Sequence, residues 1–154
     1  MCYLTNWSHR RPGAGKFVPE DIDPTLCTHI VYSFATLKNY LLAEESEKDT
    51  EMYERLIALR NKNPDIKVES YFSYISIDIH LTRILIRPKQ TVVYITALII
   101  FQILLAIGGW AFGSTPFKEL TSNTFRMNQF VYEAIEFLRE YKFDGLDVDW
   151  EYPR

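Results

Sequence analysis

The chain has 154 residues, a formal net charge of -3 at pH 7, and 47% hydrophobic residues. This is the composition of an ordinary globular domain that is long enough to bury a core. The mild acidity and the lack of a basic stripe exclude a typical nucleic-acid-binding protein. The sequence has no P-loop, dinucleotide or metal-binding pattern. We therefore expect a monomer with no cofactor, no metal and no nucleic-acid partner.

Three segments in the first two thirds of the chain, taken in order, read as strands. Residues 3–7 (YLTNW) form a short apolar strand, and residues 29–34 (HIVYSF) are rich in β-branched and aromatic residues. Residues 103–107 (ILLAI) are wholly apolar and are followed by residues 108–110 (GGW). Residues 38–49 are polar and acidic, so we expect a loop there.

Two segments have the spacing of amphipathic helices. The first begins at Asp49 or Thr50 and ends before Pro64. Its apolar face consists of Met52, Leu56 and Leu59. The second runs from about Phe125 to Tyr141, and its core stripe consists of Phe130, Val131, Ala134, Ile135 and Leu138. Strands that alternate with helices indicate a parallel sheet, with ligand groups at the carboxyl ends of the strands.

The stretch from residue 144 to 151 (DGLDVDWE) carries the clearest chemical signal. Residues two apart in a strand point to the same face, so Asp147, Asp149 and Glu151 share one side. Desolvation and mutual repulsion both oppose the ionisation of crowded acids. We therefore expect one of the three to hold a proton near neutral pH, which suits a general acid.

Two other interpretations of these acids were weighed, a solvated acidic edge and a calcium loop. The alternate residues Leu146, Val148 and Trp150 are apolar, which argues against full exposure and indicates a buried strand. A calcium loop needs a glycine and oxygen ligands in a turn, where this chain has Trp150 and Tyr152. Acid catalysis is the reading that we favour.

The same stretch carries a family resemblance. Residues 143–153 (FDGLDVDWEYP) resemble the D-x-x-D-x-D-x-E signature of glycoside hydrolase family 18, the chitinases and chitinase-like lectins. Three further segments resemble that family in the same order: residues 2–7 (CYLTNW), 26–35 (LCTHIVYSFA) and 104–113 (LLAIGGWAFG). With the connecting helices the resemblance covers residues 1–67 and 103–154, and it is nearest to the secreted animal chitinases.

The resemblance implies an α/β fold that is the N-terminal half of a (β/α)8 TIM barrel, about four βα units. A complete barrel takes about 250 residues, whereas this chain stops at Arg154. We expect the open half barrel to fold poorly and to hydrolyse little or nothing, because strand edges and apolar faces stay unpaired. No signal peptide precedes Cys2, so either the signal was lost or the product is not exported.

The resemblance also implies roles for the acids. Glu151 would protonate the glycosidic oxygen of a β-1,4-linked N-acetylglucosamine polymer, and the substrate's own acetamido oxygen would be the nucleophile, with retention. Asp149 would orient the acetamido group and relay a proton with Glu151. Asp147 would hold the shared proton, and Asp144 would anchor the turn that enters the strand. Chitinase-like lectins usually lack the terminal acid, so Glu151 favours an enzyme, with a non-catalytic chitin-binding protein as the alternative.

Chitin or chito-oligosaccharides are the expected ligands. Pyranose faces pack on aromatic rings, and the resemblance places seven residues in the cleft: Tyr3, Trp7, Phe34, Gly108, Gly109, Trp110 and Tyr152. Each ring except Trp110 is better explained, when taken alone, by core packing. The chain departs from similar chitinases at Ala111, where they usually carry Asn, and at Ser46-Glu47, where they often offer a tryptophan.

The two cysteines, Cys2 and Cys27, lie near the first two strands. Their spacing leaves open both free buried thiols and a disulfide. The resemblance implies a disulfide between them, and with it an oxidising, extracellular destination for the parent protein.

Residues 68–102, a stretch of 35, match nothing in the family. The stretch begins with valine, whose codons start with GT, and ends in Gln102, which CAG encodes. We interpret it as intron-derived, or as an error of gene structure, with no selected function. The alternative is a membrane-associated or non-functional splice product, because the run from Thr91 to Ile107 approaches transmembrane length. We do not expect a membrane span, since β-branched residues dominate the run and predict aggregation instead.

Overall fold

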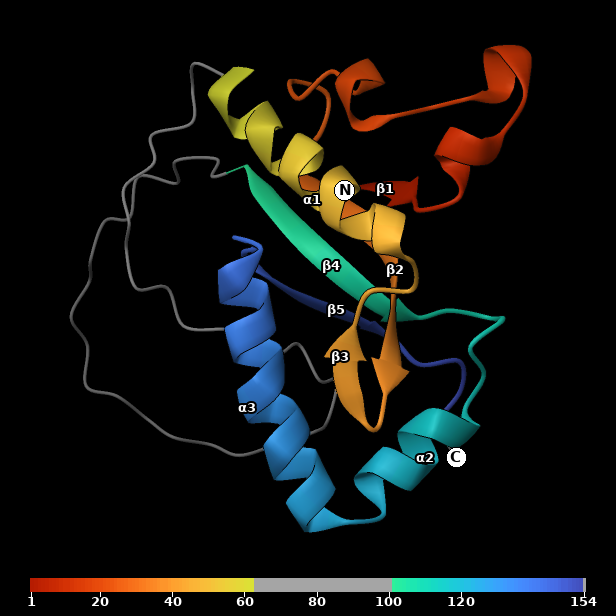
Figure 1. Cartoon of the computed structure of the whole chain (residues 1–154), viewed down its shortest axis with the longest axis vertical. Coiled ribbons are helices and arrows are strands. Elements are labelled where there is room, and N and C mark those ends of the chain that lie inside the picture. The colour runs from red at the N-terminus through yellow and green to blue at the C-terminus, as the bar shows by residue number, and fades with distance from the viewer. Residues whose placement is uncertain (63–100, 154) are drawn as a thin grey trace, which may run out of the picture.

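The computed structural model describes residues 1–62 and 101–153. Most of the stretch 68–102, and with it most of the apolar run from Thr91, lies outside the described residues. The strands are β1 (Cys2–Thr5), β2 (His29–Lys38), β3 (Leu41–Ala43), β4 (Gln102–Gly108) and β5 (Gly145–Asp149). The α-helices are α1 (Glu47–Ile57), α2 (Thr115–Thr121) and α3 (Thr124–Glu140) (Figure 1).

Four strands form a parallel sheet in the order β1-β2-β4-β5. Each strand pairs with the next parallel strand along the chain, and helical segments connect β2 to β4 and β4 to β5. This is the arrangement that alternating strands and helices predict. Because the strands are parallel, their carboxyl ends meet at one edge of the sheet.

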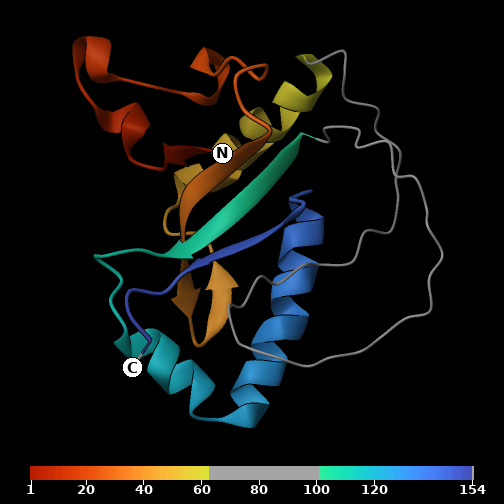
Figure 2. The same cartoon turned by 180° about the vertical axis from the view of Figure 1, so that it is seen from behind.

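The hydrophobic core lies between one face of this sheet and helices α1 and α3. Its strand residues are Leu4, Ile30, Tyr32, Ile103, Leu105 and Ile107, and its helix residues include Met52, Tyr53, Leu56, Ala134 and Leu138. Alternate strand residues point away from these helices, to the face that we call the inner face of the sheet. Figure 2, seen from behind, shows the strands in front of α1, with the inner face of the sheet toward the viewer.

A hairpin replaces the loop that we expected over residues 38–49. Strand β2 continues to Lys38, and β3 pairs with it in antiparallel register. The prediction was wrong because Leu41 to Ala43 are apolar, and Leu42 and Ala43 are buried against α3 and the core, while Lys38, Asn39 and Glu45 are polar and exposed.

Helix α1 buries the apolar face predicted for it, but it begins two residues before the expected start. The backbone N–H of Ser46 donates to Asp49 Oδ2 at 2.9 Å, and the hydroxyl of Tyr32 donates to Asp49 Oδ1 at 2.7 Å. Asp49 therefore caps the helix from a fully buried position. Burial, followed by the bond to Asp49, raises the pKa of Tyr32.

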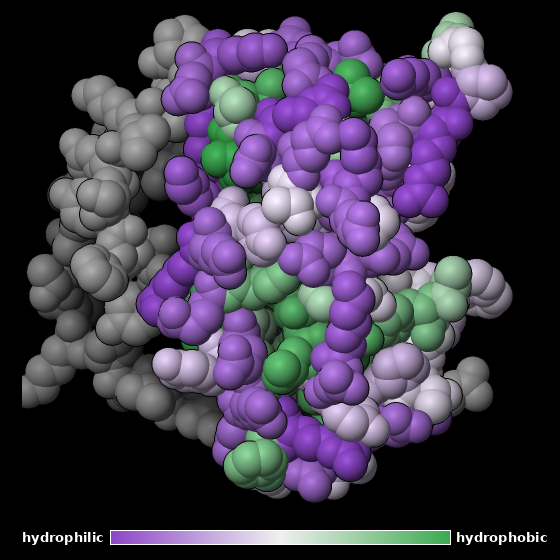
Figure 3. All heavy atoms as spheres, viewed as in Figure 1, coloured by the Kyte–Doolittle hydropathy of each residue, from purple (hydrophilic) through white to green (hydrophobic). Residues whose placement is uncertain are grey.

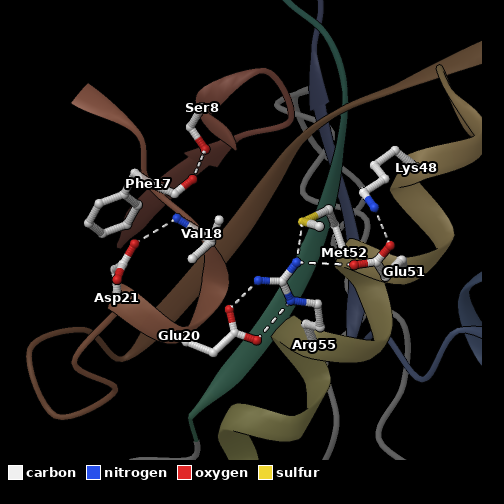
Figure 4. A network of polar contacts seen from close by, with 9 residues as sticks. All are labelled: Ser8, Phe17, Val18, Glu20, Asp21, Lys48, Glu51, Met52 and Arg55. Atoms are coloured by element: carbon white, nitrogen blue, oxygen red, sulfur yellow. Dashed lines mark hydrogen bonds and ion pairs between the residues drawn. The ribbon is translucent and has the colours of Figure 1, made fainter. Parts of the chain in front are cut away.

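An ion pair connects the long segment between β1 and β2, residues 6–28, to helix α1 (Figure 4). We call this segment the excursion. Arg55 donates from Nε and Nη2 to the two carboxylate oxygens of Glu20, at 2.8 and 2.6 Å. Its Nη1 donates to Glu51, one turn earlier in the same helix, at 3.2 Å. The Arg55 hydrogen bond lowers the pKa of Glu20 to about 2.

The predicted disulfide between Cys2 and Cys27 is present, with a Cα–Cα distance of 6.1 Å. It joins the start of β1 to the segment that enters β2. The bridge therefore closes the same excursion that the Arg55–Glu20 pair holds at its middle.

Helix α3 matches its prediction to within one residue at each end, whereas α2 was not foreseen. The side chain of Asn123 caps α3 by accepting from the N–H groups of Phe125 and Arg126. Of the predicted stripe, Ala134 and Leu138 are buried, but Val131 is 38% exposed because only one edge of the helix meets the sheet. Within the described ranges, no helix has the length and apolar character needed to cross a membrane.

Candidate functional site

The predicted cleft residues gather at the carboxyl edge of the sheet. Trp7 follows β1, Trp110 follows β4, and Tyr152 follows β5. Phe34 reaches the same edge differently, because the register of β2 against β4 shifts between Ser33 and Ala35. A bulge of this kind re-aims a side chain in mid-strand, and sequence reasoning did not predict it.

Strand β5 carries Asp147 and Asp149 on the inner face, opposite Ala106 and Gly108 of β4. Both aspartates, and Glu151 two residues beyond the strand, are partly exposed. The expectation of a buried strand was wrong, since Val148 on the outer face is 43% exposed. The reason is that β5 is an edge strand, covered on its outer side only in part.

A hydrogen bond joins the two edges of the sheet across its inner face. The hydroxyl of Tyr3 on β1 donates to Asp147 Oδ2 on β5 at 3.0 Å, although β2 and β4 lie between these strands. The sheet must therefore curl strongly, so that its inner face is concave. Burial of the hydroxyl, the bond to Asp147 and the charges of Asp147 and Asp149 raise the pKa of Tyr3 to about 12. Tyr3 thus stays a neutral donor to the carboxylate over the physiological range.

Gly108 and Gly109 let β4 approach its neighbours closely. Both have positive φ, of 114° and 81°. A Cβ at Gly108 would lie 2.1 Å from the carbonyl oxygen of Asp149, and one at Gly109 would lie 2.8 Å from Phe34 Cζ. The N–H of Gly109 donates to the same Asp149 oxygen at 2.8 Å. The close approach that these glycines permit is therefore to the protein's own strand and ring.

Aromatic rings that follow the strands at the same edge of the sheet remain accessible. Trp7 and Phe34 stack, with centroids 6.4 Å apart and planes at 27°. Trp110 is 79% exposed and Tyr152 is 60% exposed. Large exposed rings at the edge that carries the acids are not explained by core packing. They are suited to a ligand with apolar faces and a polar edge.

Ser114 holds the segment that contains Glu151, and sequence reasoning missed it. The indole Nε1 of Trp150 donates to Ser114 Oγ at 2.6 Å, and Ser114 Oγ donates to the carbonyl oxygen of Tyr152 at 3.1 Å. The Trp150 ring also stacks on Phe117 of α2, with centroids 5.2 Å apart. The residues on both sides of Glu151 are thus fixed from the loop after β4. A serine just before a helix was the only sequence signal.

Asp144 lies at the opposite end of β5 from the other acids, about 16 Å from Asp149 along an extended strand. Its Oδ2 accepts from the backbone N–H of Ile103 at 2.7 Å and from Arg60 Nη2 at 2.6 Å. These contacts join the start of β5 to β4 and to the 3-10 turn Ala58–Lys62. The structure therefore does not bring Asp144 into the group at the carboxyl edge.

Asn6 is a second residue of this edge that sequence reasoning left without a role. It is 2% exposed, and its Nδ2 donates to Glu45 and, at 3.4 Å, to the carbonyl oxygen of Phe34. It therefore links the end of β1 to the bulge of β2 and to the segment before α1.

No cluster of three or more His, Cys, Asp or Glu side chains suited to a metal occurs in the part of the chain that the structure describes.

A family model described as Glycosyl hydrolases family 18 matches residues 1–72 and 97–154. Mouse chitotriosidase-1 is 35% identical over 153 residues, which are 99% of this chain and 25% of that protein. Human chitinase-3-like protein 2 is also 35% identical over 153 residues, 99% of this chain and 30% of that protein. The chain thus spans less than a third of these relatives.

Solved structures show the same likeness. Human YKL-39, described as a pseudo-chitinase with retained chitooligosaccharide binding properties, is 34% identical with a TM-score of 0.71, over 99% of this chain and 32% of that one. The Group IV chitinase of Ostrinia furnacalis is 28% identical with a TM-score of 0.72, over 99% and 33%. Together with the sheet order, these similarities confirm the prediction of an α/β fold that forms part of a TIM barrel.

Proposed function

This chain belongs to glycosyl hydrolase family 18, and we propose that it carries the acid half of a chitinase-type site. The substrate would be a polymer of β-1,4-linked N-acetylglucosamine, cleaved with retention by a substrate-assisted mechanism. The chain spans 25% and 30% of two curated relatives, so we propose this activity for the protein in which the rest of the barrel is present. The observation that carries the proposal is the placement of Asp147 and Asp149 on the inner face of β5, with Glu151 two residues beyond the strand. Tyr3 donates a hydrogen bond to Asp147, and exposed rings lie at the same edge of the sheet.

Glu151 is the proposed proton donor to the glycosidic oxygen. It comes last in the acidic row, and Ser114 fixes the peptide on both sides of it. A general acid must be held within hydrogen-bonding reach of the leaving oxygen, and a clamped backbone restricts where its carboxyl group can go. Substitution of Glu151 by Gln would keep the shape of the side chain and remove the proton.

Asp149 and Asp147 are proposed to assist the proton transfer from Glu151 to the glycosidic oxygen. Asp149 would orient the acetamido group of the substrate, whose oxygen attacks the anomeric carbon, and would share a proton with Glu151. Asp147 would stabilise this proton, and the hydrogen bond from Tyr3 holds its carboxylate on the inner face. Trp110, Trp7 and Tyr152 would pack against the sugar rings.

A non-catalytic chito-oligosaccharide-binding protein is the second candidate. It is supported by the similarity to YKL-39, which is described as a pseudo-chitinase, and by Ala111, which offers no polar group to a sugar. Under this proposal the exposed rings would bind the ligand while Glu151 would not act.

We also propose that the protein is extracellular, for which the Cys2–Cys27 disulfide is the support.

The division into family-like residues 1–67 and 103–154, with residues 68–102 as an intron-derived insert, stays a proposal. Transcript reads that never join codons 67 and 103 directly would argue against it. A non-functional splice product is the outcome if the only transcript retains the insert and its product is not secreted.

Hydrolysis and chitin binding measured side by side separate these functions. A chitinase releases the fluorophore from a fluorogenic chitobioside and is retained by chitin beads. A binding protein is retained without turnover, and Trp110→Ala weakens its retention. Neither turnover nor retention, in a sample shown to be folded by circular dichroism, would rule out both candidates.

A further inference from the structure

A pocket of about 600 Å³ opens away from the β5 carboxylates, between the tip of the β2–β3 hairpin and helix α2. Leu37, Phe112 and Pro116 contribute apolar surface to it, and Asn39, Thr115 and Glu119 contribute polar groups. Figure 3 shows hydrophobic residues emerging among hydrophilic ones on the lower half of the face, where the hairpin, α2 and α3 lie. The catalytic proposal uses none of the pocket residues.

The ring of Tyr40 also lines this pocket, and two neighbours hold it in place. The guanidinium of Arg126, in the first turn of α3, lies 4.2 Å from the ring centroid. The Tyr40 hydroxyl donates to Glu119 Oε2 on α2 at 3.2 Å. These two contacts restrict rotation of the ring in the unliganded protein, which lowers the entropic cost of binding.

Tyr40 occupies a backbone conformation that does not suit it. Its φ is 66° and that of Asn39 is 54°, the left-handed region that a two-residue hairpin turn requires. Asparagine accepts this region, but glycine is the usual second residue, and a bulky aromatic side chain is an outlier there. Residues kept in such conformations cluster at ligand sites, where the side chain serves a purpose that the backbone alone does not.

From these observations we propose that the pocket is a second carbohydrate site, which binds a neutral pyranose unit outside the catalytic cleft. A pyranose has apolar C–H faces, which the Tyr40 and Phe112 rings and Pro116 can cover, and an edge of hydroxyl or amide groups, which Asn39, Thr115 and Glu119 can bind. Glu119 of the pocket lining and Arg126 both contact Tyr40, so these two opposite charges balance each other beside the pocket and favour a neutral ligand.

The position of the pocket relates it to the cleft. Phe112 of the pocket and Trp110 of the cleft lie on the same loop after β4, in a turn that the N–H of Phe112 closes by donating to the carbonyl oxygen of Gly109 at 3.1 Å. Their Cα atoms are therefore at most about 7 Å apart. One oligosaccharide chain can contact both, or the pocket can hold a separate strand of an insoluble polymer. The proposal does not depend on Glu151 acting as an acid.

Chitotetraose titrated into the isotopically labelled natural protein that carries this chain, followed by NMR, tests the proposal. We expect shift changes at Tyr40, Phe112 and Thr115. Tyr40→Gly removes the ring and suits the positive φ, so the hairpin should keep its fold while binding at the pocket weakens at least tenfold. Tyr40→Phe keeps the ring and should keep the binding.

Trp110→Ala separates this site from the cleft. The variant should lose the shift changes around Trp7 and Glu151 and keep those around Tyr40. Shift changes at the cleft without any at the pocket overturn this inference and leave the proposed function standing. The inference is also overturned if Tyr40→Gly, shown to be folded by circular dichroism, binds as well as the wild type, since the ring would then not contact the ligand.

Discussion

At the scale of single residues, the site depends on contacts between positions far apart in the sequence. The row of acids on β5 could be predicted from alternation alone, because the side-chain period of a strand is two. The partners that position this row could not. Tyr3 and Ser114 meet it only through the curl of the sheet and the path of the loop after β4.

Replacing Asp147 by Asn should lower the pKa of Tyr3 from about 12 toward its ordinary value of 10.0. Burial of the hydroxyl would remain, but the substitution removes the Asp147 charge, which disfavours the phenolate, and replaces the hydrogen bond to a carboxylate by a weaker one. The measurement is the ¹³C shift of the Tyr3 Cζ against pH, identified by its loss in Tyr3→Phe. An unchanged titration would mean that the hydrogen bond across the sheet does not form in solution.

Ser114→Ala should destabilise the protein by about 1–2 kcal/mol, because the indole N–H of Trp150 loses its acceptor in a partly buried setting. Ser114→Thr keeps the hydroxyl and should restore most of the loss. Urea denaturation gives both values, and Ser122→Ala, which removes a hydroxyl from an exposed helix end, is the matched control. Equal stability of Ser114→Ala and Ser122→Ala would show that Ser114 does not hold the segment around Glu151.

At the scale of elements, hydrophobic spacing predicted the strands and two helices but not everything between them. The hairpin strand β3 was missed because three apolar residues are too few to give a period. Helix α2 was missed because its Gly-Ser-Thr-Pro start reads as a turn. The extension of β2 to Lys38 was missed because the prediction depended on the β-branched and aromatic residues of 29–34, and the register shift after Ser33 was not foreseen.

The excursion before β2 is held to α1 by an ion pair whose contribution depends on pH. The folded pKa of Glu20 is about 2, below its ordinary value of 4.5. Its contribution is therefore complete above about pH 4.5 and is lost as the pH falls toward 2. Both side chains are partly exposed, so the contribution at pH 7 is at most about 1 kcal/mol.

Glu20→Gln should lower the free energy of unfolding by about 0.5–1 kcal/mol at pH 7 and leave it unchanged below about pH 2. Urea denaturation at several pH values between 7 and 2 measures the difference. Glu133→Gln on the exposed side of α3 is the control. A difference from wild type that does not shrink as the pH falls would contradict the role of this pair.

At the scale of the whole molecule, the sequence predicted the class of fold and the end of the sheet that carries the site. The four motifs follow one another in chain order, and the strands follow one another in the sheet, so motif order translated directly into position. The pocket at Tyr40 could not be foreseen, because its residues come from a hairpin, a loop and a helix that only folding brings together.

The most direct test of the account is hydrolysis of a fluorogenic chitobioside by the natural protein that carries this chain, compared between wild type, Glu151→Gln and the control Glu133→Gln. Removing a general acid should lower kcat by at least about 10²-fold, while chitin binding and the activity of Glu133→Gln stay at the level of the wild type. Hydrolysis that survives in Glu151→Gln would contradict the assignment of this side chain as the proton donor.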